Sequence, residues 1–199
     1  MHGLKILFFL SLNFFNTVYT STVIIGNGGE GYKIANQIYV RDLAENGIHL
    51  NPYFGNRSDI NFVDEIDQNL INKLDLDRVL LNLKLNDINS ILPGFVHYLI
   101  ETAHFHTWSF TGDNLSLLPD DGEIIKIPYQ ERVQIANRSL LSVRLQNKLW
   151  KQLDRKNQVA LFIHELVFAL LKPIPQHDQT NLFFQSSRVA RQIINRCVG

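Results

Sequence analysis

The chain has 199 residues, carries no formal net charge at neutral pH, and is 45% hydrophobic and 19% charged. This size and composition are typical of one globular domain. Because its positive and negative charges balance, the chain does not have the strongly basic surface that is typical of nucleic-acid-binding proteins. It also has no polybasic cluster that would favour anionic membranes. We therefore expect no nucleic-acid partner.

The first twenty residues have the layout of a secretory signal peptide. Lys5 supplies a positive charge, Ile6–Phe15 form an apolar core, and polar residues follow as far as Ser21. The core is too short to span a membrane. We expect residues 1–20 to be removed on export, which leaves residues 21–199 as a single domain, periplasmic or extracellular, without a transmembrane segment. The alternatives are an uncleaved anchor and a buried N-terminal strand.

The glycine-rich stretch 26–31, with the sequence Gly-Asn-Gly-Gly-Glu-Gly, matches the spacing of the dinucleotide-binding fingerprint. Glu45 lies at about the distance expected of a ribose contact. The fingerprint requires a helix that opens at its third glycine. Residues 32–40 are instead typical of two short strands around an Asn-Gln turn. We interpret the glycines as a turn without a ligand and expect no binding of NAD, FAD or ATP.

The middle of the chain shows helical periodicity. Apolar residues recur at helical spacing, with acidic residues between them, which predicts a set of packed amphipathic helices. We expect helices over about 59–74, 76–92 and 95–102, with Pro93-Gly94 as a break.

Shorter elements follow the predicted helices. The alternating aromatic pattern of His104–Phe110 predicts a strand, and residues 130–141 are interpreted as a helix before a short strand at 142–145. The predicted fold class is α+β and predominantly helical, with a few short strands.

One apolar helix dominates the second half of the chain. Asp154 is a suitable N-cap, and the helix ends at Lys172 because the residue before a proline resists helical geometry. Apolar side chains cover its whole circumference, which predicts a helix buried on all sides. His164 and Glu165 lie within it. A buried carboxylate needs a partner. The neighbours of Glu165 one turn away on this helix are apolar, so its partner must come from another element.

The His164-Glu165 pair on an apolar helix resembles the active-site helix of zinc metallopeptidases, in which two histidines four residues apart bind the metal. The resemblance implies that His164 is a ligand and Glu165 the general base. Phe168 occupies the position of the second histidine. Zinc would therefore need ligands from His104 and His106, which would share one side of a strand, or from His177 and Asp178.

A second resemblance covers most of the chain and is to small exported bacterial proteins with no assigned activity. It rests on the signal peptide, the Gly-Asn-Gly-Gly turn and four further motifs: Asp-Leu-x-Glu-x-Gly at 42–47, Trp150-x-x-Leu153, His164-Glu165-Leu166 and Ser187-Arg188-x-x-Arg191. The resemblance implies export and a shared architecture, and it implies no reaction.

The competing interpretation of His164-Glu165 is structural. A C-terminal helix over about 180–195 would fold back on the central helix and place Arg188 against Glu165. The same three residues, if open to solvent, would form an acid–base site. We therefore expect an exported non-enzymatic protein with an unknown ligand and no cofactor. The alternative is a metal-dependent hydrolase that uses His164 as ligand and Glu165 as base.

Overall fold

The computed structural model of the chain describes residues 29–34, 37–41, 60–117, 131–139 and 141–171. The predicted signal peptide, Glu45, His177 and Asp178, and the C-terminal helix predicted to carry Arg188 lie outside these residues. Within them the protein has an α+β fold that is rich in helix, as the sequence predicts. None of the helices described there is long and apolar enough to cross a membrane.

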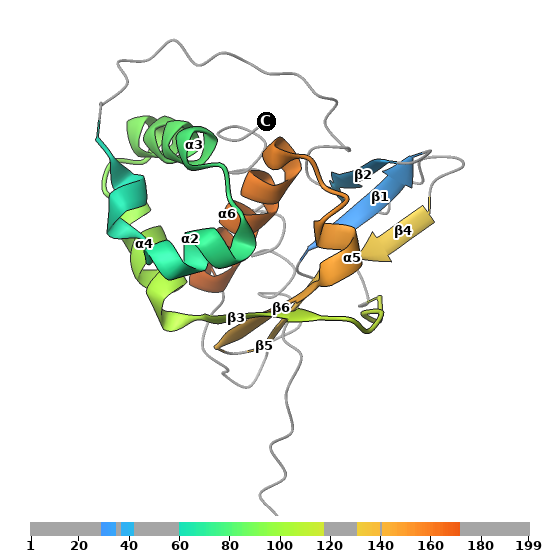
Figure 1. Cartoon of the computed structure of the whole chain (residues 1–199). Helices are drawn as coiled ribbons and strands as arrows, with labels where there is room; N and C mark the ends of the chain where they lie inside the picture. The colour runs from blue at the N-terminus through green and yellow to red at the C-terminus, as the bar shows by residue number, and fades with distance from the viewer. Residues whose placement is uncertain (1–28, 35–36, 42–59, 118–130, 140, 172–199) are drawn as a thin grey trace, which may run out of the picture.

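Within the described part of the chain, six short strands form two sheets, which Figure 1 shows. The first sheet is antiparallel and has the order β2-β1-β4; its strands are β1 (Glu30–Ile34), β2 (Gln37–Val40) and β4 (Glu131–Gln134). The second sheet has the order β3-β6-β5 and contains β3 (Thr107–Thr111), β5 (Ala136–Ser139) and β6 (Ser142–Gln146). β3 runs parallel to β6, whereas β5 runs antiparallel to it. The predicted strand pair in residues 32–40 is confirmed by β1 and β2.

The helices follow the order of the chain. They are the 3-10 helix η1 (Phe62–Glu65) and the α-helices α2 (Gln68–Leu74), α3 (Arg78–Ile91), α4 (Phe95–Phe105), α5 (Asn147–Trp150) and α6 (Arg155–Leu171). Asp67 and Asp77 cap α2 and α3, each with a side-chain oxygen that accepts a backbone N–H. Gly94, with φ of 81°, lets the chain turn sharply into α4.

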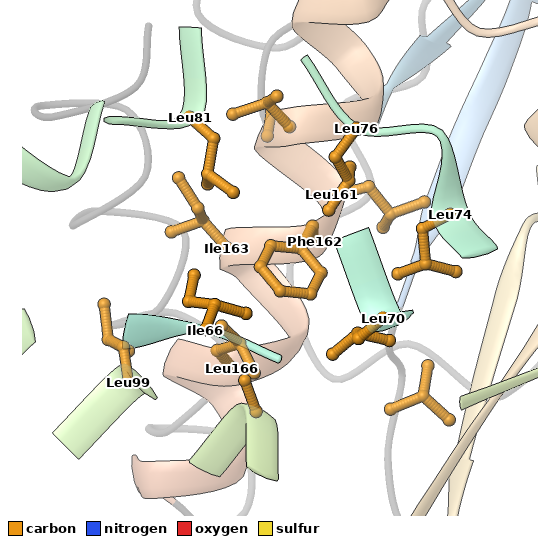
Figure 2. Packing of buried hydrophobic residues seen from close by; sticks show 14 of the residues in the cluster. Ile66, Leu70, Leu74, Leu76, Leu81, Leu99, Leu161, Phe162, Ile163 and Leu166 are labelled. Carbon is orange, nitrogen blue, oxygen red and sulfur yellow. The ribbon is translucent and has the colours of Figure 1, made fainter. Parts of the chain in front are cut away.

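α6 is the centre of the molecule. In Figure 1, α2, α3 and α4 lie to the left of α6, the first sheet lies to its right, and the second sheet lies below it. Every residue from Asn157 to Phe168 is buried, which confirms the prediction of a helix enclosed on all sides. Figure 2 shows leucine and isoleucine side chains of the smaller helices converging on Leu161, Phe162 and Leu166 of α6.

The two sheets are joined through Ile135, the residue between β4 and β5. The carbonyl oxygen of Gly29 accepts hydrogen bonds from both Ile135 N, at 2.8 Å, and Ala136 N, at 3.2 Å. Two residues of one strand therefore oppose one residue of the other, which is the arrangement of a β-bulge. Both Ile135 and Ala136 are buried completely. The extra residue carries the chain from one sheet into the other.

Two predictions about individual elements are wrong. Residues 131–139 do not form a helix, because Glu131–Gln134 pair with β1 and Ala136–Ser139 pair with β6. The strand predicted at His104 starts at Thr107, because α4 continues to Phe105. The helix predicted over 76–92 is confirmed by α3, on which Val79 is 72% exposed while the polar Asn86 and Asp87 are buried.

Candidate functional site

One row of side chains on the second sheet faces α6. Trp108, Val143 and Arg138 lie directly opposite one another on β3, β6 and β5. At one end of this row, the indole ring of Trp108 packs against Phe162 with ring centroids 5.0 Å apart. At the other end, Arg138 reaches Phe168. Because Phe162, Glu165 and Phe168 follow one another at intervals of three residues, Glu165 belongs to the same side of α6.

Arg138 is a buried cation beside this part of α6. Its guanidinium carbon lies 4.5 Å from the centroid of the Phe168 ring, and Nη2 donates to the Phe168 carbonyl oxygen at 3.5 Å. Arg138 is 3% exposed and Glu165 is 1% exposed. Burial lowers the pKa of the Arg138 guanidinium from its usual value, and the negative charge of Glu165 acts in the opposite direction. Each charge therefore compensates the other inside the core.

His164 lies beside this pair on α6. Its side chain is buried, and its imidazole ring stacks on Phe168 with the centroids 6.0 Å apart. Phe168, which occupies the place of the second histidine of a metallopeptidase helix, therefore contacts both His164 and Arg138. An aromatic side chain that covers a cation on one side and an imidazole on the other fills the position where a second ligand would stand.

The two other histidines proposed as metal ligands do not share one side of a strand, because both precede β3, His104 in the last turn of α4 and His106 as its C-cap. His104 is exposed in the last turn of α4, where its Nε2 donates to the Glu65 carbonyl oxygen at 2.9 Å. His106 follows α4, and its Nδ1 donates to the Thr102 carbonyl oxygen at 2.9 Å. Across the described ranges, no three histidine, cysteine or acidic side chains are grouped to hold a metal ion.

The glycine-rich stretch is required by packing. Gly29 has φ of +66°, and a Cβ atom on it would lie 2.4 Å from Cβ of Ala136. A Cβ on Gly31 would lie 2.6 Å from Cδ1 of Ile135 and 2.8 Å from the Tyr39 carbonyl oxygen. Gly31 lies within β1, so a strand rather than a helix contains the third glycine of the fingerprint. This is not the geometry of a dinucleotide site.

A charged cluster on the first sheet escaped the sequence analysis. The Glu30 carboxylate accepts from Nη1 of Arg41 through Oε2 at 3.1 Å, and from Nη2 of Arg132 through Oε1. The Glu30 and Arg41 side chains are 4% and 6% exposed. Glu30 stood inside the glycine motif, and Arg132 stood in a segment interpreted as a helix. The alternation of polar with apolar residues over 132–135 was the available indication of a strand.

A surface hollow of about 370 Å³ lies between η1 and α3, away from both charged groups. Its polar groups are used inside the protein. The Asn82 amide bonds to Val63 N and to the Ile60 carbonyl oxygen, and Arg78 pairs with Asp64 at 2.8 Å. The hollow therefore offers a ligand few free polar contacts, and we assign it no role.

No protein-family model matches the chain, and comparisons with curated proteins and with solved structures find no significant match. The resemblances to metallopeptidase helices and to small exported bacterial proteins therefore rest on the residues of this chain alone.

Proposed function

We propose that this is an exported, non-enzymatic binding protein, periplasmic or extracellular, in which His164 and Glu165 hold the core together rather than catalyse a reaction. The observation that carries the proposal is the buried guanidinium of Arg138 beside the buried carboxylate of Glu165. Among the described residues Arg138 supplies a cation for Glu165, whereas Arg188, to which the sequence assigned this role, lies outside them, and its pairing with Glu165 stays a prediction. A cation already present beside the carboxylate would oppose the binding of a metal dication there.

The burial of the pair also argues against a general base. A base must come within hydrogen-bond reach of the substrate proton, directly or through one water molecule. Glu165 is buried, with only 1% of its surface exposed, and its charge acts on the buried Arg138. An acid–base site with Glu165 and His164 would need this part of the core to open.

The test is a double-mutant cycle on Glu165 and Arg138, followed by urea unfolding. Either Glu165→Gln or Arg138→Met leaves one buried charge without its counter-charge, and each should lower the unfolding free energy by roughly 3–5 kcal/mol. The double variant should lose less than the sum of the two single losses. Glu101→Gln, on the exposed side of α4, is the matched control and should have little effect.

The same cycle separates this proposal from a metal-dependent hydrolase. Unfolding is repeated with added zinc, and the metal content of the purified protein is measured. Small additive losses for Glu165→Gln and Arg138→Met, with zinc-dependent stabilisation that His164→Ala abolishes, would establish the hydrolase instead. In that case Glu165 would be the base that activates a metal-bound water molecule.

A further inference from the structure

The outer side of α4 carries two aromatic rings with a carboxylate between them. Tyr98 is 60% exposed, Phe105 is 73% exposed, and Glu101 is exposed as well. Glu101 comes three residues after Tyr98 and four before Phe105, so the three side chains follow one another along one side of the helix. The inner side carries Leu99 and Ala103, which join the core, and Figure 2 shows Leu99 within the cluster around α6. The three outer side chains therefore face solvent.

The polar groups on this outer side are not used inside the protein. Among the described residues, the Tyr98 hydroxyl and the Glu101 carboxylate have no hydrogen bond or ion pair, and the Phe105 ring packs on no other ring. His97, one turn before Glu101, is held instead, because its Nδ1 lies 3.5 Å from Oε2 of Glu65. Polar residues usually cover the solvent side of a helix, whereas exposed Tyr and Phe are enriched where proteins contact partners.

The chemistry of these three side chains favours a cation, and a guanidinium in particular. The face of an aromatic ring attracts a cation, and a neighbouring carboxylate strengthens the attraction. α4 contains no lysine or arginine that could occupy this place. A guanidinium is planar, so it can stack on the ring of Tyr98 or Phe105 while its N–H groups bond to the Glu101 carboxylate. The ammonium group of lysine has no plane to stack.

The spacing of the two rings fits an extended peptide. Tyr98 and Phe105 are two helical turns apart, which is about 10 Å along the axis. In a polyproline II segment, side chains three residues apart share one side and are separated by about 9 Å. Two arginines at this interval can therefore place one guanidinium at each ring, with Glu101 between them.

We propose that the outer side of α4 binds an arginine-bearing segment of a partner protein, with guanidinium groups stacked on Tyr98 and Phe105 and paired with Glu101. The proposal names a ligand class for the binding protein proposed above and rests on that function only for the absence of turnover. A failed peptide titration leaves the Glu165–Arg138 cycle unaffected, and a failed cycle leaves the titration interpretable.

The experiment is an NMR titration of the purified protein with the peptide acetyl-Gly-Arg-Gly-Gly-Arg-Gly-amide, observed at the backbone amides of α4. We expect saturable shifts that are weaker with citrulline in place of arginine, since citrulline keeps the shape and lacks the charge. Phe105→Leu keeps an apolar side chain without the ring and should weaken binding about two- to fivefold, the usual effect of one exposed cation–π contact. Val79→Ala, on the exposed side of α3, is the matched control and should bind as the wild type does.

A second variant separates binding from folding. Glu101→Gln should weaken peptide binding while urea unfolding stays as in the wild type, because its carboxylate has no partner among the described residues. Equal binding of the arginine and citrulline peptides, or wild-type binding by both Phe105→Leu and Glu101→Gln, would overturn the site. Equal binding of a lysine peptide would overturn the assignment to arginine.

Two other occupants of this side of α4 are tested in parallel. Sedimentation of the wild type and of Phe105→Leu measures self-association, and vesicles of phosphatidylcholine measure binding to a membrane surface. Self-association that Phe105→Leu abolishes would overturn the proposal in favour of a second copy of the chain. Tighter binding to the vesicles than to the arginine peptide would overturn it in favour of a lipid headgroup.

Discussion

At the scale of single residues, Glu165 shows what a sequence can and cannot predict about a buried charge. Because the neighbours of Glu165 one turn away on α6 are apolar, its partner had to come from another element. The strand β5 places the cation of Arg138 beside it. Arg138 was not named because residues 130–141 were interpreted as a helix. Whether a short segment becomes a strand depends on the strands available to pair with it, and those lie far away in the sequence.

The first prediction concerns Gly29, whose backbone at φ +66° suits glycine. Gly29→Ala places a methyl group against Ala136 and adds the cost of a left-handed conformation, about 1–2 kcal/mol for an L-residue. Urea unfolding should show a loss of at least this size. Gly112→Ala is the control, since a Cβ atom there meets nothing within 4 Å. Equal effects of the two substitutions would contradict the packing role assigned to Gly29.

A second prediction concerns Lys156 in the first turn of α6. Its pKa is lowered from the usual 10.5, first by burial and then by repulsion from Lys84, while Asp154 acts in the opposite direction. A cation at the start of a helix also opposes the helix dipole. Lys156→Gln should therefore raise the unfolding free energy at pH 7, by roughly 0.3–1 kcal/mol at low salt.

The pH dependence of this effect has a definite sign. Between the lowered pKa of the folded state and 10.5, the unfolded chain binds more protons at Lys156 than the folded protein does, so wild-type stability rises with pH. Below that window Lys156 is protonated in both the folded and the unfolded state, so the loss of stability that its charge causes no longer changes with pH. Urea unfolding from pH 7 to pH 10 should show the difference between wild type and Lys156→Gln shrinking as pH rises. The exposed Lys151→Gln should show no such convergence.

At the scale of elements, the start of α6 joins the helix to the first sheet. Asp154 Oδ1 accepts from Asn157 N at 2.7 Å, which confirms Asp154 as the predicted cap. The same carboxylate oxygen accepts from Asn157 Nδ2, which leaves Asn157 Oδ1 to accept from Val40 N at 2.8 Å. Val40 is the last residue of the edge strand β2. Asn157, which is held by the helix cap Asp154, therefore also accepts the last backbone N–H of this strand.

The third prediction follows from this link. Asn157→Ala leaves the buried N–H of Val40 without its acceptor and should lower the unfolding free energy by about 1–3 kcal/mol. Hydrogen exchange of the Val40 amide should accelerate in the variant more than that of amides in α2. The exposed Asn72→Ala on α2 is the control. An unchanged exchange rate at Val40 would show that the hydrogen bond to Asn157 does not hold the edge strand.

The elements that the sequence predicts well are those whose bounds depend on residues close by in the chain. The extent of α6 follows from its cap and its apolar run, and the break before α4 follows from Pro93-Gly94. The errors have non-local causes. Val79 and Leu83 are exposed on α3 because Leu81 and Leu85 take the inner side. A pattern with apolar residues on both sides of a helix does not specify which side is covered.

At the scale of the whole molecule, β1 is the central strand of the first sheet and pairs with β4 about a hundred residues later in the chain. Residues 1–28, which include the expected signal peptide, lie outside the described residues, so export stays a prediction.

The fourth prediction tests export. Protein recovered from the cell envelope or the medium should have an intact mass that starts near Ser21 or Thr22, because the apolar core of residues 6–15 is the segment that a signal peptidase substrate requires. Lys5→Glu together with Leu10→Arg, which disrupts that core, should leave the chain in the cytosol. A full-length chain recovered from the cytosol of the wild type would contradict export.

The bulge at Ile135 and Ala136 sets which side chains point inward on either side of it. In β4 the odd-numbered Val133 packs on the core, whereas in β5 the even-numbered Ala136 and Arg138 do so. The side chains of a strand point alternately to its two faces, so one extra residue reverses which of the following residues point inward. Regular alternation over the same residues, without the bulge, would turn Arg138 outward and Asn137 inward. The carboxylate of Glu165 would then face an uncharged amide, so the electrostatics of the core depend on this bulge.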